Sequence, residues 1–291
     1  MPELPDLAIV ADAFHAALAG RQLTSARAPG PLAVRGTPAE LEALVGQTLT
    51  RLHRRGKLLV LELSRDRVVI NPMLTGRLQL TAPETALPSK TAVVLAFGAR
   101  PARPRGAARW TQKATWMPAD DAPVEVRYRD PTQMGKVYVA PAGVSRVIPG
   151  LTDEELGPDA DDPALTLDVW RARIRRHPGE LKNLLKNQGF VAGIGNAYSD
   201  EILHAARLLP FRKRTTLAAE EVDALYGATR ATVENAISEL RKRVPPTFEK
   251  QARDWLAVHD KGGQPCPRCG TKISEVKPGG FVTSFCRGCQ H

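Results

Sequence analysis

The chain has 291 residues, enough to bury more than one hydrophobic core, so we expect two or three domains. Its 41 Lys and Arg outnumber its 31 Asp and Glu, and the net charge of +10 favours a polyanion such as nucleic acid over a small neutral substrate. No apolar run reaches 18 residues, and Asp6 and Asp12 interrupt the first apolar stretch, which argues against a membrane span and a signal peptide. We therefore expect a cytosolic protein of bacterial type.

The chain begins Met1-Pro2-Glu3-Leu4-Pro5. If Met1 is removed, the Pro2 nitrogen becomes a free secondary amine, and an α-amino group with a pKa near ~8 is partly unprotonated at neutral pH. Such an amine can attack a sugar carbon and form an iminium ion, and the neighbouring Glu3 carboxyl group can transfer protons. An ordinary helix start with Pro5 in its first turn is the alternative, and these five residues alone favour it.

A helical pattern over residues 7–18 is followed by alternating and apolar runs that predict strands between Gly and Pro turns. The predicted strands are residues 57–63, 68–70, 77–80, 93–97, 124–128 and 136–139. Antiparallel strands of this kind predict a two-layer β-sandwich, so residues 1–142 are expected to form one domain. A Pro-, Ala- and Arg-rich stretch at residues 99–122 is expected to be a basic surface loop.

A helical region, residues 150–248, follows a boundary at residues 143–150. Apolar spacing predicts helices over residues 165–174, 180–186 and 199–208, and two more over residues 217–244. The third helix is preceded by the glycine turn Val191-Ala192-Gly193-Ile194-Gly195-Asn196. Such a turn lets backbone N–H groups approach a phosphate, and a tight helix–helix connection explains it equally well. The predicted fold class is therefore multidomain α+β.

All four cysteines lie in the last 26 residues, as the pairs Cys266-x2-Cys269 and Cys286-x2-Cys289. Each pair directs two thiolates at one ion, and two pairs complete a tetrahedral site. We therefore predict a zinc ribbon over residues 258–291 with one structural Zn²⁺. A redox function for two dithiol pairs is the alternative.

Four of these features together resemble the formamidopyrimidine-DNA glycosylase and endonuclease VIII family of base-excision repair enzymes. They are the Pro2-Glu3 start, the isolated Lys57, the glycine turn with Asn196, and the terminal ribbon. The resemblance covers almost the whole chain. Residues 182–207 resemble the family's helix-two-turns-helix, Asp130-Pro131 and Gly135 match its central turn, and residues 286–291 resemble its closing cysteine knuckle.

The resemblance implies a bifunctional glycosylase and abasic-site lyase that acts, as a monomer, on double-stranded DNA with a damaged base or an abasic site. Pro2 would attack the sugar C1′, Glu3 would transfer protons, and Lys57 would contact a phosphate or the sugar oxygen. The implied phosphate contacts are Lys182 and Asn196. The implied wedges that fill the space of the extruded base are Leu74 and Met134. A solvated strand end also explains Lys57, and a core position also explains either wedge.

Some positions depart from the family pattern. Thr132 and Gln133 stand where formamidopyrimidine-type members have two arginines, and Phe281 stands where the ribbon's phosphate-binding arginine is expected. Arg287 or Lys277 is the candidate replacement for that charge. The segment 247–259 looks too short and too helical for the loop that caps an oxidised purine. Oxidised pyrimidines, ring-opened purines and abasic sites are therefore at least as favoured as 8-oxoguanine.

Two other classes of function remain open. A protein of the same fold that binds damaged or branched DNA without cutting it would tolerate the missing arginines at Thr132, Gln133 and Phe281. The intact residues Pro2, Glu3, Lys57 and Asn196 argue against it, because binding alone does not need an amine together with a carboxylate. A zinc-ribbon transcription or RNA-binding factor would explain the cysteines and the charge but not the amino terminus.

Overall fold

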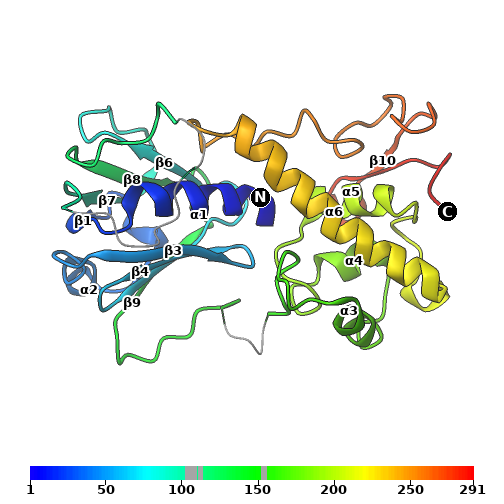
Figure 1. Ribbon diagram of the computed structural model, residues 1–291, viewed down its shortest axis with the longest axis horizontal. Coiled ribbons are helices and arrows are strands. Elements are labelled where there is room, and N and C mark those ends of the chain that lie inside the picture. The colour runs from blue at the N-terminus through cyan, green and yellow to red at the C-terminus, as the bar shows by residue number, and fades with distance from the viewer. Residues whose placement is uncertain (102–109, 111–113, 152–155) are drawn as a thin grey trace. The chain divides into compact units, whose positions relative to one another are not determined.

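The structure is a computed structural model that describes residues 1–101, 110, 114–151 and 156–291 (Figure 1). The chain packs into two compact units. Unit 1 contains Met1–Pro2, Asp6–Pro149 and Leu240–Gln251, and unit 2 contains Glu3–Pro5, Gly150–Glu239 and Ala252–His291. The predicted basic loop at residues 99–122 lies partly outside the described residues.

Unit 1 contains most of α1 (Leu4–Leu18) and two sheets (Figure 1). The antiparallel first sheet has the order β1 (Leu23–Arg27), β7 (Thr91–Phe97), β8 (Val124–Arg129), β6 (Arg77–Thr81). The second has the order β2 (Val34–Arg35), β9 (Lys136–Ala140), β5 (Arg67–Asn71), β4 (Leu58–Leu63), β3 (Leu49–Arg55). It is antiparallel except for the short β2–β9 pair. A 3-10 turn, η1 (Pro31–Ala33), precedes β2.

All six predicted strands form, whereas β1, β2 and β3 were not predicted. A short helix that was also missed, α2 (Pro38–Glu42), begins at a reciprocal cap. The Glu40 N–H donates to Thr37 Oγ1, and the Thr37 N–H donates to Glu40 Oε2. Each side chain therefore satisfies a backbone donor that the helix start leaves open.

Unit 2 contains α3 (Leu167–Ile174), α4 (Leu181–Lys186), α5 (Asn196–Ala205), the 3-10 turn η2 (Arg214–Thr216) and most of α6 (Ala219–Arg243). Its core is built around the buried rings of Trp170, Phe190 and Tyr198, and Leu4 packs into the same core. One 25-residue helix, α6, forms where two were predicted. Its last turn packs with unit 1, so the predicted domain 150–248 is divided between the units.

The C-terminal ribbon is part of unit 2. Its antiparallel strands β10 (Ser274–Val276) and β11 (Thr283–Phe285) are joined by the 3-10 turn η3 (Pro278–Gly280). Among the described residues, no helix is both long and apolar enough to cross a membrane.

Candidate functional site

The glycine turn holds the Glu3 carboxylate at the start of α5. The N–H groups of Gly195 and Ala197 donate to its two oxygens at 2.7 and 2.8 Å, and the Tyr198 N–H donates at 3.3 Å. Glu3 is only 2% exposed. Because the first N–H groups of a helix carry partial positive charge and lack partners within the helix, they favour a carboxylate there. The sequence suggested that backbone N–H groups of this turn could approach a phosphate. In the structure these N–H groups donate to Glu3.

Two glycines of this turn are needed for the close approach of the amino-terminal segment. A Cβ on Gly195 would lie 2.6 Å from Glu3 Cδ. Gly193 has a φ of +97°, and a Cβ there would lie 2.6 Å from the Cβ of Leu4. The Leu4 N–H also donates to the Gly193 carbonyl at 2.9 Å. The glycines therefore serve residues 3 and 4, an explanation that the sequence did not suggest.

Pro2 lines a small pocket in unit 1. Its polar lining comes from Asp6 of α1, from Arg77 at the start of β6, and from Lys250 and Gln251 after α6. The cavity volume of about 20 Å³ leaves room for about one water molecule. Arg77, Lys250 and Gln251 were not predicted as site residues, because no local pattern brings residues 250–251 to the amino terminus.

The segment that supplies Lys250 and Gln251 was expected to be helical, and that expectation is wrong. Residues 247–259 form turns and loops without a helix. The Pro245-Pro246 pair ends α6, because proline cannot donate the N–H that a further helical turn requires.

Lys57 lies in the two-residue loop between β3 and β4. Gly56, the first loop residue, has a φ of +55°, the conformation that tight hairpins take with glycine at this position. The turn expected at Lys57 is therefore present, and the Lys57 side chain is half-buried.

The two candidate wedges lie on turns that share one buried carboxylate, Asp130. Its oxygens accept hydrogen bonds from the Thr75 hydroxyl at 2.5 Å and the Gly135 N–H at 2.6 Å. Leu74, beside Thr75, is half-buried, and Met134, beside Gly135, is 43% exposed. The core alternative for Met134 is therefore wrong, and the wedge function of both residues stays a prediction.

The electrostatics of Asp130 follow from these bonds. Burial alone raises the pKa of Asp130, but the hydrogen bonds from Thr75, Gly135 and Thr132 outweigh burial and lower the pKa below its usual value. Thr132, which replaces an expected arginine, lies with its hydroxyl 2.5 Å from that of Thr75. Threonine in place of the expected arginine at position 132 therefore connects the two turns through a hydroxyl contact and leaves this position without a cation.

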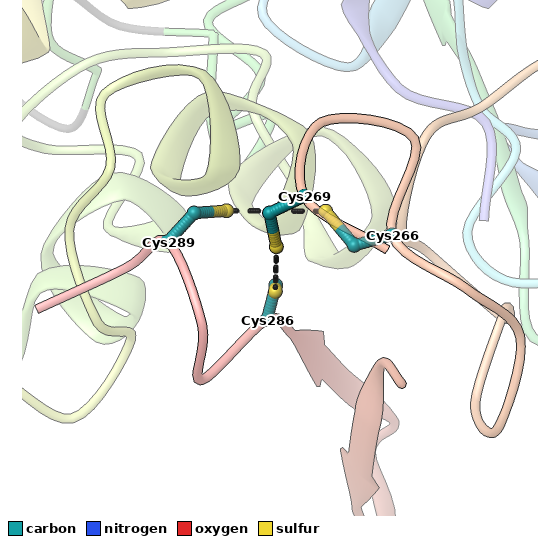
Figure 2. Close-up of side chains that lie close together, drawn as sticks. All are labelled: Cys266, Cys269, Cys286 and Cys289. Atoms are coloured by element: carbon teal, nitrogen blue, oxygen red, sulfur yellow. Dashed lines mark hydrogen bonds between the residues drawn. The ribbon is translucent and has the colours of Figure 1, made fainter. Parts of the chain in front are cut away.

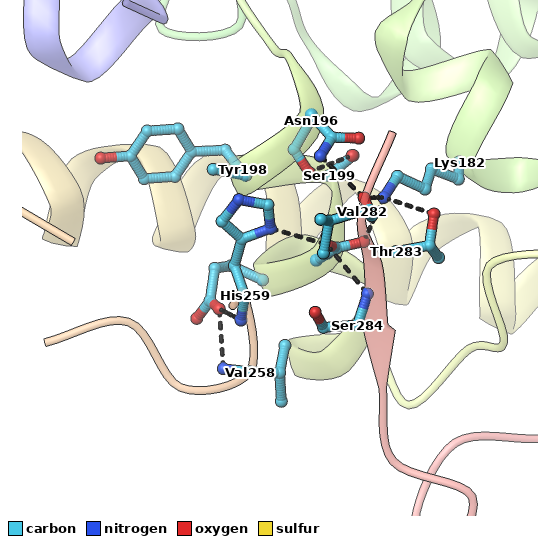
Figure 3. Close-up of polar contacts among 12 residues, drawn as sticks. Lys182, Asn196, Tyr198, Ser199, Val258, His259, Val282, Thr283 and Ser284 are labelled. Carbon is cyan, nitrogen blue, oxygen red and sulfur yellow. Dashed lines mark hydrogen bonds and ion pairs between the residues drawn. The ribbon is translucent and has the colours of Figure 1, made fainter. Parts of the chain in front are cut away.

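Lys182 has a structural role in place of the predicted phosphate contact (Figure 3). Its buried ammonium donates to Asp200 Oδ1 at 2.7 Å and to the Val282 carbonyl and Thr283 Oγ1 at 2.8 Å. Burial lowers the pKa of Lys182, and Asp200 acts in the opposite direction. Because all three N–H donors are bound inside unit 2, Lys182 fixes the start of β11 to α4 and α5.

Asp200 and Glu201 also fix the segment that leads into the ribbon. Asp200 Oδ2 lies 2.8 Å from His259 Nδ1 and accepts from the Ser284 N–H at 3.2 Å (Figure 3). Glu201 accepts from the N–H groups of residues 257, 258 and 259. Both acids matched the family in sequence, but their function in placing the ribbon was not predicted.

Asn196 contacts the residue directly before β11. Its Nδ2 donates to the Val282 carbonyl at 2.7 Å, whereas its Oδ1 is buried without a hydrogen-bond partner in the described part of the chain. The phosphate contact of Asn196 stays a prediction.

The ribbon tip carries an aromatic ring and a lysine instead of the expected arginine. Phe281 is 54% exposed, and the Lys186 ammonium of α4 lies 5.0 Å from its ring centroid. The Arg287 guanidinium lies 5.8 Å from the centroid of Phe285. Lys186 thus provides a cation at Phe281. The sequence had suggested Arg287 or Lys277 for this charge, and Lys186 was not predicted.

The four cysteines form one cluster (Figure 2). Their Sγ atoms all lie within 4.8 Å of one another, with 3.4 Å between Cys269 and Cys286 and 3.8 Å between Cys266 and Cys289. Four thiolates at zinc–sulfur distances of 2.3 Å in a tetrahedron are ~3.8 Å apart, so the residues fit one closed structural Zn²⁺ site.

His204 of α5, which was not predicted, supports this site. Its Nε2 lies 3.3 Å from Cys266 Sγ. Burial, with a smaller contribution from Arg268, lowers the pKa of His204 to about 4. The neutral imidazole can therefore donate its N–H to the thiolate, as groups around metal ligands commonly do.

Three family models match successive parts of the chain. The model of the formamidopyrimidine-DNA glycosylase N-terminal domain matches residues 1–137. The model of the formamidopyrimidine-DNA glycosylase H2TH domain matches residues 156–244. The model of the zinc finger found in FPG and IleRS matches residues 263–291. The fold resembles that in a crystal structure of the Lactococcus lactis Fpg with an abasic site containing DNA. The TM-score is 0.82 at 23% identity, over 99% of both chains.

Curated relatives match over most or all of their length. The formamidopyrimidine-DNA glycosylase of Geobacillus kaustophilus is 31% identical over 100% of both chains. That of Symbiobacterium thermophilum is 31% identical over 100% of this chain and 89% of its own length. Together with the three domains in the same order, this identity shows that the chain belongs to the formamidopyrimidine-DNA glycosylase family.

Proposed function

We propose that this protein is a base-excision repair glycosylase with abasic-site lyase activity, which removes oxidised or ring-opened bases from double-stranded DNA. The observation that carries the proposal is the amino terminus. Pro2 lines a pocket with polar side chains, and the next residue, Glu3, is held by three backbone N–H groups. A protein that only binds damaged DNA does not need an amine beside a fixed carboxylate.

In the proposed mechanism the unprotonated Pro2 nitrogen attacks the sugar C1′. The glycosidic bond breaks and the base leaves with a proton. The C1′–O4′ bond of the sugar ring then breaks, O4′ takes a proton, and C1′ becomes an iminium carbon. The iminium withdraws electrons, so loss of the C2′ proton expels the 3′ phosphate. A second proton loss then expels the 5′ phosphate. Glu3 transfers protons in these steps, and the N–H groups that hold it limit the positions its carboxylate can take.

DNA binding is supported by charge and by loop geometry. The excess of ten positive charges attracts the backbone irrespective of sequence. Lys57 lies in a tight turn from which an ammonium can contact a phosphate, and Asn196 is the second proposed phosphate contact. Leu74 and Met134 are the proposed wedges, because an extruded base leaves a gap in the stack.

Borohydride trapping on a duplex with one abasic site tests the nucleophile. Borohydride reduces an iminium to a stable amine, so the processed, zinc-loaded protein should give a covalent protein–DNA band and cleave the strand. A short tag placed before Pro2 should abolish both, because the nitrogen is then an amide. The same tag at the carboxyl terminus is the matched control and should leave both intact. Binding of the duplex without band or cleavage would favour the alternative, a non-catalytic damaged-DNA binding protein.

A further inference from the structure

We propose that unit 2 has a binding site for a phosphate group, in a pocket lined by Arg171, Arg175 and Arg214. The pocket lies between the end of α3, the η2 turn and the start of α6, and all of its lining residues belong to unit 2. None of these residues takes part in the proposed catalysis, so the site is independent of the proposed mechanism.

The pocket is large enough for such a group. Its cavity volume is about 280 Å³, several times the ~30 Å³ that one water molecule occupies in the liquid. The apolar part of its lining comes from Ile174, Leu217 and Val222, and the polar part comes from the three arginines, Thr215 and Asp223. A pocket with more cations than carboxylates attracts an anion over a neutral ligand.

The carboxylate of the pocket is already bound to one of the arginines. Arg171 Nε donates to Asp223 Oδ1 at 2.8 Å, and Arg171 Nη2 donates to Asp223 Oδ2 at 2.5 Å. Within the described residues, neither Arg175 nor Arg214 forms an ion pair with an acidic side chain, whereas Arg171 does. Two positive charges of the pocket are therefore without a counterion from this part of the chain.

Arg214 also has a buried donor without an acceptor. Its Nη2 donates to the Arg175 carbonyl at 3.2 Å, which holds the guanidinium at the end of α3. Its Nε is buried without a hydrogen-bond partner among the residues that the structure describes. A buried N–H group of a charged side chain is costly to leave unpaired, so it normally has an acceptor. A water molecule would satisfy the Nε–H but leave the two charges uncompensated, whereas an anion does both.

The chemistry of the donors favours phosphate. Guanidinium groups bind phosphate oxygens through pairs of parallel N–H bonds. Ala219, the first residue of the 25-residue helix α6, lines the same pocket, and a helix N-terminus carries partial positive charge that favours phosphate. Because a phosphate group offers more acceptor oxygens than a carboxylate, it can bind several of these donors together. Free phosphate and the DNA backbone are two sources of this group.

Calorimetric titration of inorganic phosphate into the zinc-loaded protein at low salt tests the site. Arg214→Gln and Arg175→Gln should each weaken the binding of phosphate by about 5-fold or more, because each removes a charged donor. The matched control is Arg176→Gln, which removes the same charge at the next residue, exposed and outside the pocket lining, and should stay within about 2-fold. Arg175 is exposed, so its substitution should leave the urea unfolding midpoint near that of the wild type.

The salt dependence of binding to an undamaged duplex distinguishes the two sources. If the phosphate belongs to the DNA backbone, Arg214→Gln and Arg175→Gln should each reduce the slope of log K against log salt by ~0.9, and Arg176→Gln should not. An unchanged slope together with weakened binding of inorganic phosphate would assign the site to free phosphate.

Three results would overturn the inference. One is a wild type without saturable phosphate binding whose salt slope is also unchanged in both pocket variants. Another is an equal effect of Arg176→Gln in either measurement, because the arginines would then act only through the net charge. The third is binding of acetate as tight as that of phosphate, because the pocket would then accept any small anion.

Discussion

At the scale of single residues, the proposed chemistry depends on the space that Gly195 leaves for the Glu3 carboxylate. In Gly195→Ala the added Cβ would lie 2.6 Å from Glu3 Cδ, so the carboxylate must move away from its three N–H donors. We expect single-turnover base removal to fall by about 10-fold or more, since a small misplacement of a catalytic group costs that much. Zinc content should not change. Wild-type rates in this variant would show that the position of Glu3 is not limiting.

A second residue-scale prediction concerns Asp130 and pH. The pKa of Asp130 is lowered in the folded state, so its carboxylate stabilises the fold above its unfolded pKa near ~3.9, and this contribution is lost as pH falls through the folded pKa. Asp130→Asn leaves the Gly135 N–H or the Thr75 hydroxyl without its charged acceptor, which costs ~1–3 kcal/mol at pH 7. Urea unfolding of both proteins should give a difference at pH 7 that shrinks below pH ~4. A difference independent of pH would contradict this explanation.

Residues whose function depends on local spacing could be predicted from the sequence, and those that depend on burial could not. The spacing of Cys266, Cys269, Cys286 and Cys289 defines a tetrahedral site without knowledge of the fold. Lys182 was assigned to phosphate, because nothing near it in the sequence indicates that Asp200, Val282 and Thr283 surround its ammonium. Gln251 was missed for the same reason, since its contact with Arg77 joins residues 174 positions apart.

At the scale of elements, the same distinction holds for strands and helices. The apolar and alternating runs of β4 to β9 are visible in the sequence, whereas β3 reads LTRLHRR and has only two buried residues, which hides its period of two. The helix α6 was predicted as two. Gly227 lies inside it, and one glycine weakens a helix by about 1 kcal/mol without ending it.

Gly227 therefore offers an element-scale prediction. It is exposed, and a Cβ built there would meet nothing within 4 Å. Gly227→Ala should raise the free energy of unfolding by ~0.5–1 kcal/mol, because alanine loses less backbone entropy in the helix. Equilibrium urea unfolding measures the change, and base removal should stay at the wild-type rate. A destabilised variant would mean that α6 needs glycine at this position.

At the scale of the whole molecule, the net charge of +10 predicts DNA binding that weakens with salt, and single lysines should contribute to this dependence differently. If Lys57 binds a phosphate, Lys57→Gln should reduce the slope of log K against log salt by ~0.9, because one fewer counterion is released. Lys182→Met should leave the slope unchanged, since its ammonium is already bound to three protein acceptors.

The same pair of variants separates electrostatic binding from structural support. Lys182→Met leaves Asp200 buried without its cation, so it should lower the free energy of unfolding by ~3–5 kcal/mol, whereas Lys57→Gln, in a half-buried hairpin loop, should change it much less. Binding titrations from low to moderate salt and urea unfolding measure the two effects. A reduced salt slope for Lys182→Met with unchanged stability would restore the phosphate contact. A change in stability without a change in slope would assign this lysine to the attachment of β11.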